Sequence, residues 1–294
     1  MGGVLVWFFF HLRLFPFYPG GVHAEIMIGG FYLTIAAGFL MTAIPRLSGT
    51  ATASTVEKTA ALLASLAGFA VVWKTNRFFF HAILLLQLLL LIRFATKRLF
   101  KGPFAPAPPF VLTAFGNLSA LAGIVILLIN DFHPCSPPLL TAARGLFFYG
   151  FFLGGVLGIG SLLIPMILGA GNLPQSPTPL STTVSRLPHI GKFSLLGLSL
   201  AGSFFVDAYV GIRWGSLIRA IVVGILLLKW PLFQRPPKGI LYWMLWLSGW
   251  ILLVGFWPAV LRPDLALHTN HTIFIGTVSL MIFGIATRVT LAHG

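Results

Sequence analysis

The residues best suited to chemistry are histidines that stand where long apolar segments begin. His23 and Glu25 open the stretch HAEIMIGGFYL, and further histidines stand at His81, His268 and His271. Imidazole is a common ligand of haem iron, copper and zinc, so a cluster of these side chains at one depth predicts a metal or cofactor site. Residues three apart share a helix face, which allows His268 and His271 to point the same way.

The alternative is that each histidine separately caps a helix, bonds a backbone carbonyl or lies among lipid headgroups. Any single histidine fits this alternative better. His23, His268 and His271 as a set favour a site, because polar groups in apolar segments are costly unless they are partnered or functional. His81, which follows TNRFFF, is the weakest of the four predicted metal ligands. Glu25 lies about 200° around a helix from His23, which makes a shared metal ion unfavourable; we expect Glu25 to be either the hydrogen-bond partner of an imidazole or a carboxylate at the membrane interface.

Composition indicates which elements must position these residues. Hydrophobic residues make up 57% of the 294 positions and charged residues 8%. Mean hydropathy is +0.97, whereas soluble domains carry roughly 25% charged residues. We therefore predict an all-α protein, a polytopic bundle of about nine to ten transmembrane helices in the lipid bilayer. The location that we expect for it is the bacterial inner membrane.

The charge balance excludes one class of partner. Nineteen Lys and Arg residues oppose five Asp and Glu residues, but the basic residues lie between apolar runs, where the positive-inside rule accounts for them. No basic stripe interleaved with aromatic residues is present, so we expect no nucleic-acid binding. The single cysteine, Cys135, excludes an intrachain disulfide.

A helical span needs about 20 apolar residues to cross a hydrocarbon core of about 30 Å. A short N-terminal apolar segment comes first, and nine further segments follow it. The second and seventh of the nine are short for a span. The nine segments run over 23–44, 59–73, 78–95, 110–129, 145–169, 192–209, 215–230, 240–259 and 269–290.

Basic residues predict the orientation. Alternate loops, starting with the loop that holds Arg46 and Lys58, carry about twice as many Lys and Arg residues as the others, which places these loops in the cytoplasm. The four candidate histidines then converge on the external side. We expect a single membrane domain over 1–294, with two halves, 1–170 and 191–294, joined by a cytoplasmic loop at 171–190 that is rich in Pro, Ser and Thr.

Two further patterns concern packing and charge. Asp207 stands near the turn between the sixth and seventh segments, and we expect it to form an ion pair with Arg213 that closes this turn; a proton or cation site is the alternative. Gly150, Gly154 and Gly158 recur every four residues, which predicts a face where another helix approaches closely.

Two stretches carry a resemblance to a known family. HAEIMIGGFYLTIAAGFLMTAIPRLSG and HTNHTIFIGTVSLMIFGIATRVTLAHG resemble the early and late motifs of NnrS proteins, in the same order. The middle of the chain is similar only in hydropathy. The family pattern continues for about two helices beyond the late motif, so this chain is expected to be shorter than the family's usual length.

The resemblance implies a polytopic membrane protein that binds haem and copper and acts in nitric oxide metabolism or resistance to nitrosative stress. It implies cofactor-binding roles for His23, His271, Arg288 and His293. Glu25 stands where the family has a second histidine. The predicted orientation places Arg288 and His293 on the cytoplasmic side, opposite His23.

The competing function is a transporter or channel that carries a small solute and needs no metal cofactor. A coloured cofactor in the purified protein would distinguish the two. A prenyl transferase of the intramembrane type needs paired aspartates to hold magnesium, and the sequence has no such pair. We find no catalytic acid or second redox centre, so the sequence leaves open whether the protein is an enzyme.

Overall fold

The computed structural model describes residues 8–13, 20–72, 77–104, 106–169 and 187–291. Within these ranges every regular element is a helix and none is a strand, which confirms the predicted all-α membrane bundle. The chain forms two compact units. The first is Met1–Phe104 with Leu127–Pro134, and the second is Ala105–Ile126 with Cys135–Gly294. The halves expected from the sequence, 1–170 and 191–294, stay a prediction, and most of the expected linker lies outside the described residues.

Seven helical stretches of the described residues are long and apolar enough to cross a membrane. Each corresponds to one of the nine predicted segments. They are Gly20–Ser48, Arg77–Lys101, Phe110–Phe132, Pro137–Ile167, Pro188–Tyr209, Ile240–Leu261 and Pro263–Ile285.

The predicted count of nine to ten spans is somewhat higher than the seven found among the described residues. The two short segments form α4 (Thr55–Val72) and α10 (Ile212–Leu227), of 18 and 16 residues. At 1.5 Å per residue, α10 is about 24 Å long, which is less than the hydrocarbon thickness of a bilayer. The N-terminal apolar segment is described only over residues 8–13.

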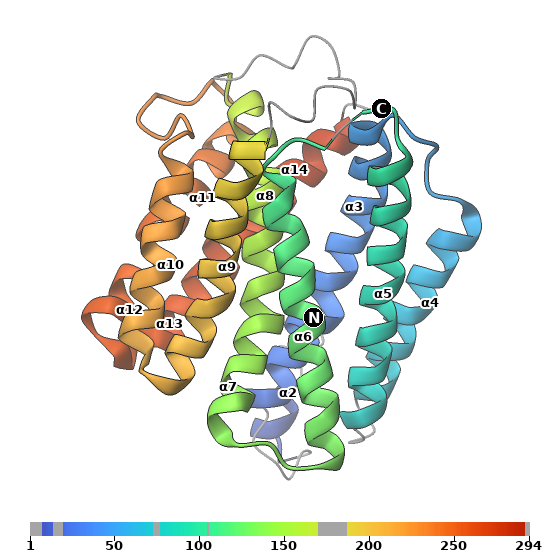
Figure 1. Ribbon diagram of the computed structural model, residues 1–294, viewed down its shortest axis with the longest axis vertical. Coiled ribbons are helices and arrows are strands. Elements are labelled where there is room, and N and C mark those ends of the chain that lie inside the picture. The colour runs from blue at the N-terminus through green and yellow to red at the C-terminus, as the bar shows by residue number, and fades with distance from the viewer. Residues whose placement is uncertain (1–7, 14–19, 73–76, 105, 170–186, 292–294) are drawn as a thin grey trace. The chain divides into compact units, whose positions relative to one another are not determined.

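The first unit contains one long helical stretch and two antiparallel helices. The stretch comprises α2 (Gly20–Glu25), η1 (Ile26–Tyr32) and α3 (Leu33–Ser48), and it packs against α4 and α5 (Arg77–Lys101). Figure 1 shows α3, α4 and α5 side by side. The end of α6, from Leu127, completes this unit.

The start of α4 is a reciprocal capping box. The backbone N–H of Ser54 donates to a Glu57 carboxylate oxygen at 2.8 Å, and the N–H of Glu57 donates to Ser54 Oγ at 3.2 Å. Both bonds satisfy backbone donors that a helix start leaves open. Arg98 of α5 donates to both oxygens of the same carboxylate, at 2.9 and 2.8 Å, and so joins α4 to α5.

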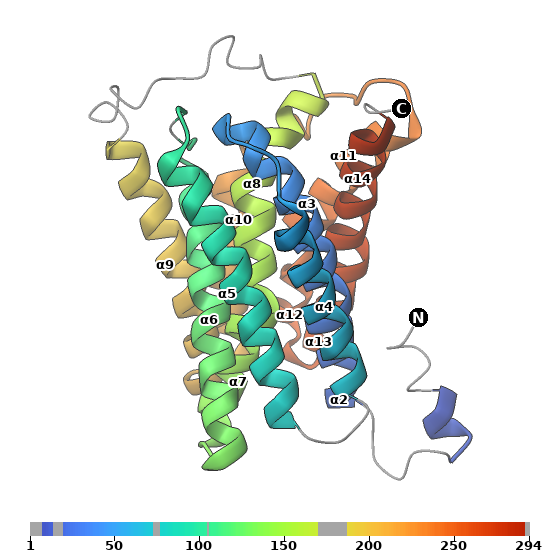
Figure 2. The same cartoon turned by 90° about the vertical axis from the view of Figure 1, so that its right-hand side faces the viewer.

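The second unit is built from paired helices. α9 packs on α10, and α11 packs on η6 and α14; Figure 1 shows the first pair and Figure 2 shows α11 beside α14. The elements not yet given bounds are α6 (Phe110–Phe132, shared with the first unit), α7 (Pro137–Gly145), η2 (Leu146–Gly150), α8 (Phe151–Ile167), α9 (Leu187–Tyr209), α11 (Ile240–Gly255), α12 (Trp257–Leu261), η5 (Pro263–Leu265), α13 (Ala266–His271), η6 (Thr272–Ser279) and α14 (Leu280–Leu291).

The glycine face of the fifth predicted segment packs against a neighbouring helix, as expected. A Cβ atom added at Gly154 would lie 2.5 Å from the Cα of Gly116 on α6, which no side chain could accommodate. Glycine at both positions lets the two backbones touch. This contact fixes α8 against the part of α6 that belongs to the second unit.

Three of the seven spans contain a π-helical segment, a form that is rare in proteins and often marks functional sites. These segments are η1, η2 and η6. His23 lies three residues before η1, and His271 is the residue directly before η6. His23 and His271, two of the predicted ligands, thus lie close to the point where an α-helix gives way to a π-helix in their own span.

Candidate functional site

In the first unit, three ionisable side chains from different spans meet in the interior. Nδ1 of His81 lies 2.7 Å from an oxygen of Asp131, and Nε2 of His81 lies 3.8 Å from an oxygen of Glu25. The His81 side chain is 3% exposed, Asp131 7% and Glu25 10%. A hydrogen bond joins His81 to Asp131, whereas Nε2 has no hydrogen-bond partner among the described residues.

The fold explains how this cluster forms. Glu25 is the last residue of α2, His81 lies in the first turns of α5, and Asp131 is the penultimate residue of α6. All three residues therefore lie near the ends of their spans. Ionisable groups buried within a membrane protein are costly and are usually partnered or functional, and here each has a partner of the opposite type.

The geometry gives His81 a different environment from that of a simple metal ligand. Its two ring nitrogens face two separate carboxylates, so Glu25 and Asp131 lie on opposite sides of the imidazole. Such an arrangement suits a proton or an imidazolium held between two anions. A carboxylate on the far nitrogen is also the usual partner of an imidazole that binds a metal. His81 as a metal ligand stays a prediction.

His23 lies on α2, two residues before Glu25, and it is half-buried. The contact of Glu25 with His81 shows that the start of α2 and the start of α5 are at the same end of the first unit. The sequence prediction placed His23 and His81 at one end of their helices, and the structure agrees for this pair.

In the second unit, His268 and His271 lie on α13 and are both exposed. Nδ1 of His271 is 2.9 Å from the carbonyl oxygen of Leu267. Because a carbonyl only accepts hydrogen bonds, the proton is on Nδ1, and the lone pair of a neutral ring is then on Nε2. A backbone carbonyl on one nitrogen is the usual way in which proteins orient an imidazole that binds a metal through the other.

A buried ion pair also lies in the second unit, and the sequence assigned it to the wrong arginine. Arg219 lies 2.8 Å from an oxygen of Asp207, and it also donates to Ser203 and Ser216 at 3.2 and 3.0 Å. Arg213, the expected partner, is exposed. Side chains on a helix lean towards its N-terminus, so Arg219 reaches back along α10 to the turn where Asp207 lies.

A pocket of about 240 Å³ lies beside this ion pair. Its wall includes Arg219, Asp207, Tyr149 and Thr269. Thr269 is buried, and its hydroxyl has no hydrogen-bond partner among the described residues. The pocket therefore offers a charged pair and an unused hydroxyl to a small polar molecule.

The remaining predicted residues have less structural information. Arg288 belongs to α14, but its side chain lies outside the described part of the structure, as does the whole of His293. His23 belongs to the first unit and His271 to the second, and their shared site stays a prediction. Among the described residues, no three His, Cys, Asp or Glu side chains form a group that could hold a metal ion.

Comparison with protein families gives the decisive observation, because the family described as NnrS protein matches residues 2–294. The chain belongs to the NnrS family. Comparisons with curated proteins and with solved structures found no match. The family membership confirms the resemblance seen in the two motifs and extends it over the middle of the chain.

Two functional candidates of this NnrS protein were missed by sequence reasoning. Asp131 falls just beyond the segment predicted at 110–129 and so is not among the predicted site residues. The predicted partner of Asp207 is Arg213, which is nearer in sequence than Arg219. One signal could have identified both: the chain has only five acidic residues, so each acid close to an apolar segment needs a partner.

Proposed function

We propose that this NnrS-family protein is a haem-binding integral membrane protein of the bacterial cytoplasmic membrane that acts in the response to nitric oxide. Family membership supports the link to nitric oxide, and the seven apolar helices support the membrane location. A bound haem would supply an iron atom able to bind nitric oxide. His271 and His23 are the residues that we propose as its ligands.

The observation that carries this proposal is the hydrogen bond from His271 Nδ1 to the Leu267 carbonyl. It fixes the ring orientation and the tautomer before any cofactor arrives, and it puts the metal-binding lone pair on Nε2. A haem iron needs only one or two protein ligands, in contrast to a structural metal site. The geometry of His271 therefore fits a haem whose iron is bound by a histidine.

Copper fits the described residues less well, because protein copper sites combine several nitrogen and sulfur ligands and no group of three candidate side chains is found among those residues. We therefore propose copper only as a second metal. The family resemblance also supports roles for Arg288 and His293 in cofactor binding.

The absorption spectrum of detergent-purified protein from haem-replete cells tests the proposal. We expect a Soret band whose intensity per protein falls at least several-fold in His271→Ala and in His23→Ala. His189, an exposed histidine of α9, supplies the matched control, and His189→Ala should retain the band. Elemental analysis of the same samples measures iron and copper.

A second candidate function is the transport of a small polar solute, and the pocket beside Arg219 and Asp207 favours it. Buried charges in transmembrane helices commonly line solute or proton pathways. This function predicts a colourless, metal-free protein whose thermal stability rises with a particular solute. The absorption spectrum therefore separates the two functions.

A further inference from the structure

The residues that line the pocket beside Arg219 and Asp207 all belong to the second unit. They come from α7, η2, α9, α10, α12 and α13, together with Phe256 between α11 and α12. Figure 1 shows α10 beside α12 and α12 beside α13. A water molecule occupies about 30 Å³ in the liquid, so the pocket volume of about 240 Å³ corresponds to about eight waters. A small organic molecule has this size.

One part of the pocket wall is aromatic. Phe148, Tyr149, Phe204 and Phe256 line it. Phe204 and Phe256 are almost fully buried, and the guanidinium carbon of Arg219 lies 5.1 and 5.5 Å from the centres of their rings. Aromatic rings favour offset-stacked or edge-to-face contacts with another flat ring. This part of the pocket therefore suits a ligand with an apolar or aromatic body.

The charged side chains that line the pocket leave one positive charge in excess. They are Arg144, Asp207 and Arg219. Nη2 of Arg219 lies 2.8 and 3.1 Å from the two carboxylate oxygens of Asp207, so these two charges neutralise each other. Arg144 is exposed, and no ion pair or hydrogen bond joins its side chain to another described residue. The guanidinium of Arg144 is therefore available to an anion, and it suits a carboxylate in particular.

Uncharged side chains of the pocket add unused hydrogen-bond donors. The Thr269 hydroxyl is buried and has no partner among the described residues. Tyr149 and Asn270 are half-buried, and their side chains make no hydrogen bond within the described ranges. Electrostatic interactions with Arg219 and Asp207 place the Tyr149 hydroxyl near the ion pair. A buried donor without an acceptor costs free energy, so a ligand that supplies acceptor oxygens removes this cost.

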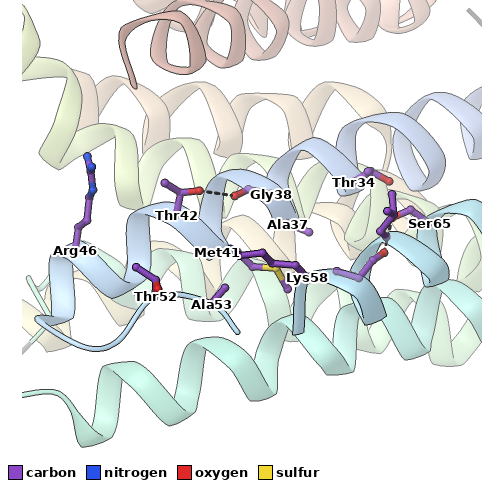
Figure 3. Close-up of a pocket in the computed structure, with 12 residues that line it drawn as sticks. Thr34, Ala37, Gly38, Met41, Thr42, Arg46, Thr52, Ala53, Lys58 and Ser65 are labelled. Atoms are coloured by element: carbon purple, nitrogen blue, oxygen red, sulfur yellow. Dashed lines mark hydrogen bonds between the residues drawn. The ribbon is translucent and has the colours of Figure 1, made fainter. Parts of the chain in front are cut away.

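A groove of about 460 Å³ between α3 and α4 in the first unit has hydroxyl groups in a different state (Figure 3). Thr34, Thr42 and Ser65 line this groove, and each donates to the carbonyl oxygen four residues earlier, at 2.6, 3.1 and 2.9 Å. Figure 3 shows the bond from Thr42 to Gly38. Such bonds use the hydroxyl proton within the helix. Thr269 makes no bond of this kind, so its hydroxyl is available to a ligand.

We propose that the pocket beside Arg219 and Asp207 binds a small monocarboxylate, with its oxygens at Arg144 and Thr269 and its apolar body against the aromatic wall. An ionised carboxylate only accepts hydrogen bonds, which matches a pocket rich in unused donors. Its single charge balances that of Arg144. The proposal does not depend on haem binding; it rests on the pocket that favours the transport function and names the class of solute.

Thermal unfolding of the full chain in detergent tests this proposal. The probe is sodium benzoate, and benzamide is an uncharged analogue of the same shape. A ligand that binds only the folded state raises its stability as the ligand concentration rises. We expect benzoate to raise the melting temperature with a saturable concentration dependence, whereas benzamide, and sodium chloride at the same ionic strength, should not.

Two variants test the proposed ligand-binding residues. Thr269→Val removes a hydroxyl that has no partner among the described residues, so the unliganded protein should melt as wild type does. The midpoint of the benzoate titration should rise about tenfold, because a hydrogen bond to a charged group is lost. Arg144→Gln should raise this midpoint at least tenfold, because it removes the excess charge of the pocket.

Each variant has a matched control. Thr141 lines the same pocket, but its hydroxyl already donates to the Pro137 carbonyl oxygen at 3.0 Å, so Thr141→Val should bind benzoate like wild type. Arg213 is exposed and does not line the pocket, so Arg213→Gln removes the same charge without changing the site. It should also match wild type.

The proposal is overturned if benzoate has no effect, if benzamide stabilises the protein equally, or if Thr269→Val and Arg144→Gln bind benzoate like wild type. Benzoate binding is measured by the melting temperature and haem by the absorption spectrum, so each result can be obtained without the other. A protein that binds benzoate but does not carry it across vesicle membranes supports this proposal and contradicts only the transport function.

Discussion

Nδ1 of His81 lies 2.7 Å from a carboxylate oxygen of Asp131, although 50 residues separate the two in sequence. This contact joins α5 to the end of α6 in the first unit, and Glu25 of α2 lies on the opposite side of the same imidazole. Three spans thus share one buried polar cluster. The predictions that follow concern this cluster and other contacts inside each of the two units.

Removing the carboxylate of Asp131 should destabilise the first unit. Asp131→Asn weakens a buried hydrogen bond to a charged group, for which a loss of roughly 1–3 kcal/mol is expected. Thermal unfolding in detergent measures the loss. Asp264→Asn is the control, because Asp264 and its partner Arg262 are largely exposed and exposed pairs contribute little. Equal effects of the two variants would show that the buried cluster does not stabilise the fold.

Arg219 should be far more important to the second unit than Arg213. Arg219→Ala leaves Asp207 buried without its cation, which typically costs about 3–5 kcal/mol, whereas Arg213→Ala changes an exposed side chain and should cost under about 0.5 kcal/mol. Comparison of the two melting temperatures checks this order. A larger loss of stability in Arg213→Ala than in Arg219→Ala would instead support the pairing of Asp207 with Arg213 that was expected from the sequence.

Acid should weaken the contact between Glu57 and Arg98. The hydrogen bond from Arg98 lowers the pKa of Glu57 from its ordinary 4.5 to about 2. The stabilisation is then fully present above pH 4.5 and is lost as the pH falls towards 2. Wild type should be more stable than Glu57→Gln by about 1 kcal/mol at pH 7, and the difference should shrink below pH 4.5. A difference that stays constant between pH 7 and pH 3 would contradict the assignment.

Gly154 should tolerate no side chain, whereas its neighbour Gly155 should. Gly154→Val drives a side chain into the backbone of Gly116 and should cost about 1–3 kcal/mol, because a backbone atom cannot move aside. A Cβ atom added at Gly155 would have no atom within 4 Å, so Gly155→Val should cost much less. Melting temperatures of the two variants, one residue apart, measure the contact between α6 and α8 directly.

Much of the fold follows from local properties of the sequence. Each of the seven spans is a run of apolar residues long enough for the bilayer, and the spacing of Gly150, Gly154 and Gly158 predicted a close helix contact. The overcount came from α4 and α10, which are apolar and helical but short. The π-helical segments carry no recognised sequence signal, so the position of η1 and η6 just after His23 and His271 became visible only in the structure.

The sites were harder to predict because their residues meet through tertiary packing. Asp131 follows an apolar run by two residues, and nothing local links it to His81. Arg219 lies on α10, twelve residues after Asp207 of α9, and the turn between the two helices separates them. Arg213 is nearer to Asp207 in sequence and was therefore predicted as its partner. By contrast, His271 could be selected from its residue type and position, while the hydrogen bond to Leu267 that orients its ring required coordinates.

The measurement that most directly tests the central claim is the haem content per protein of the purified wild type and of the double variant His23→Ala with His271→Ala. We predict stoichiometric haem in wild type and at least tenfold less in the double variant, with both proteins folded and membrane-inserted. Equal haem content in the two proteins, or a wild type without haem when expressed in haem-replete cells, would contradict the claim.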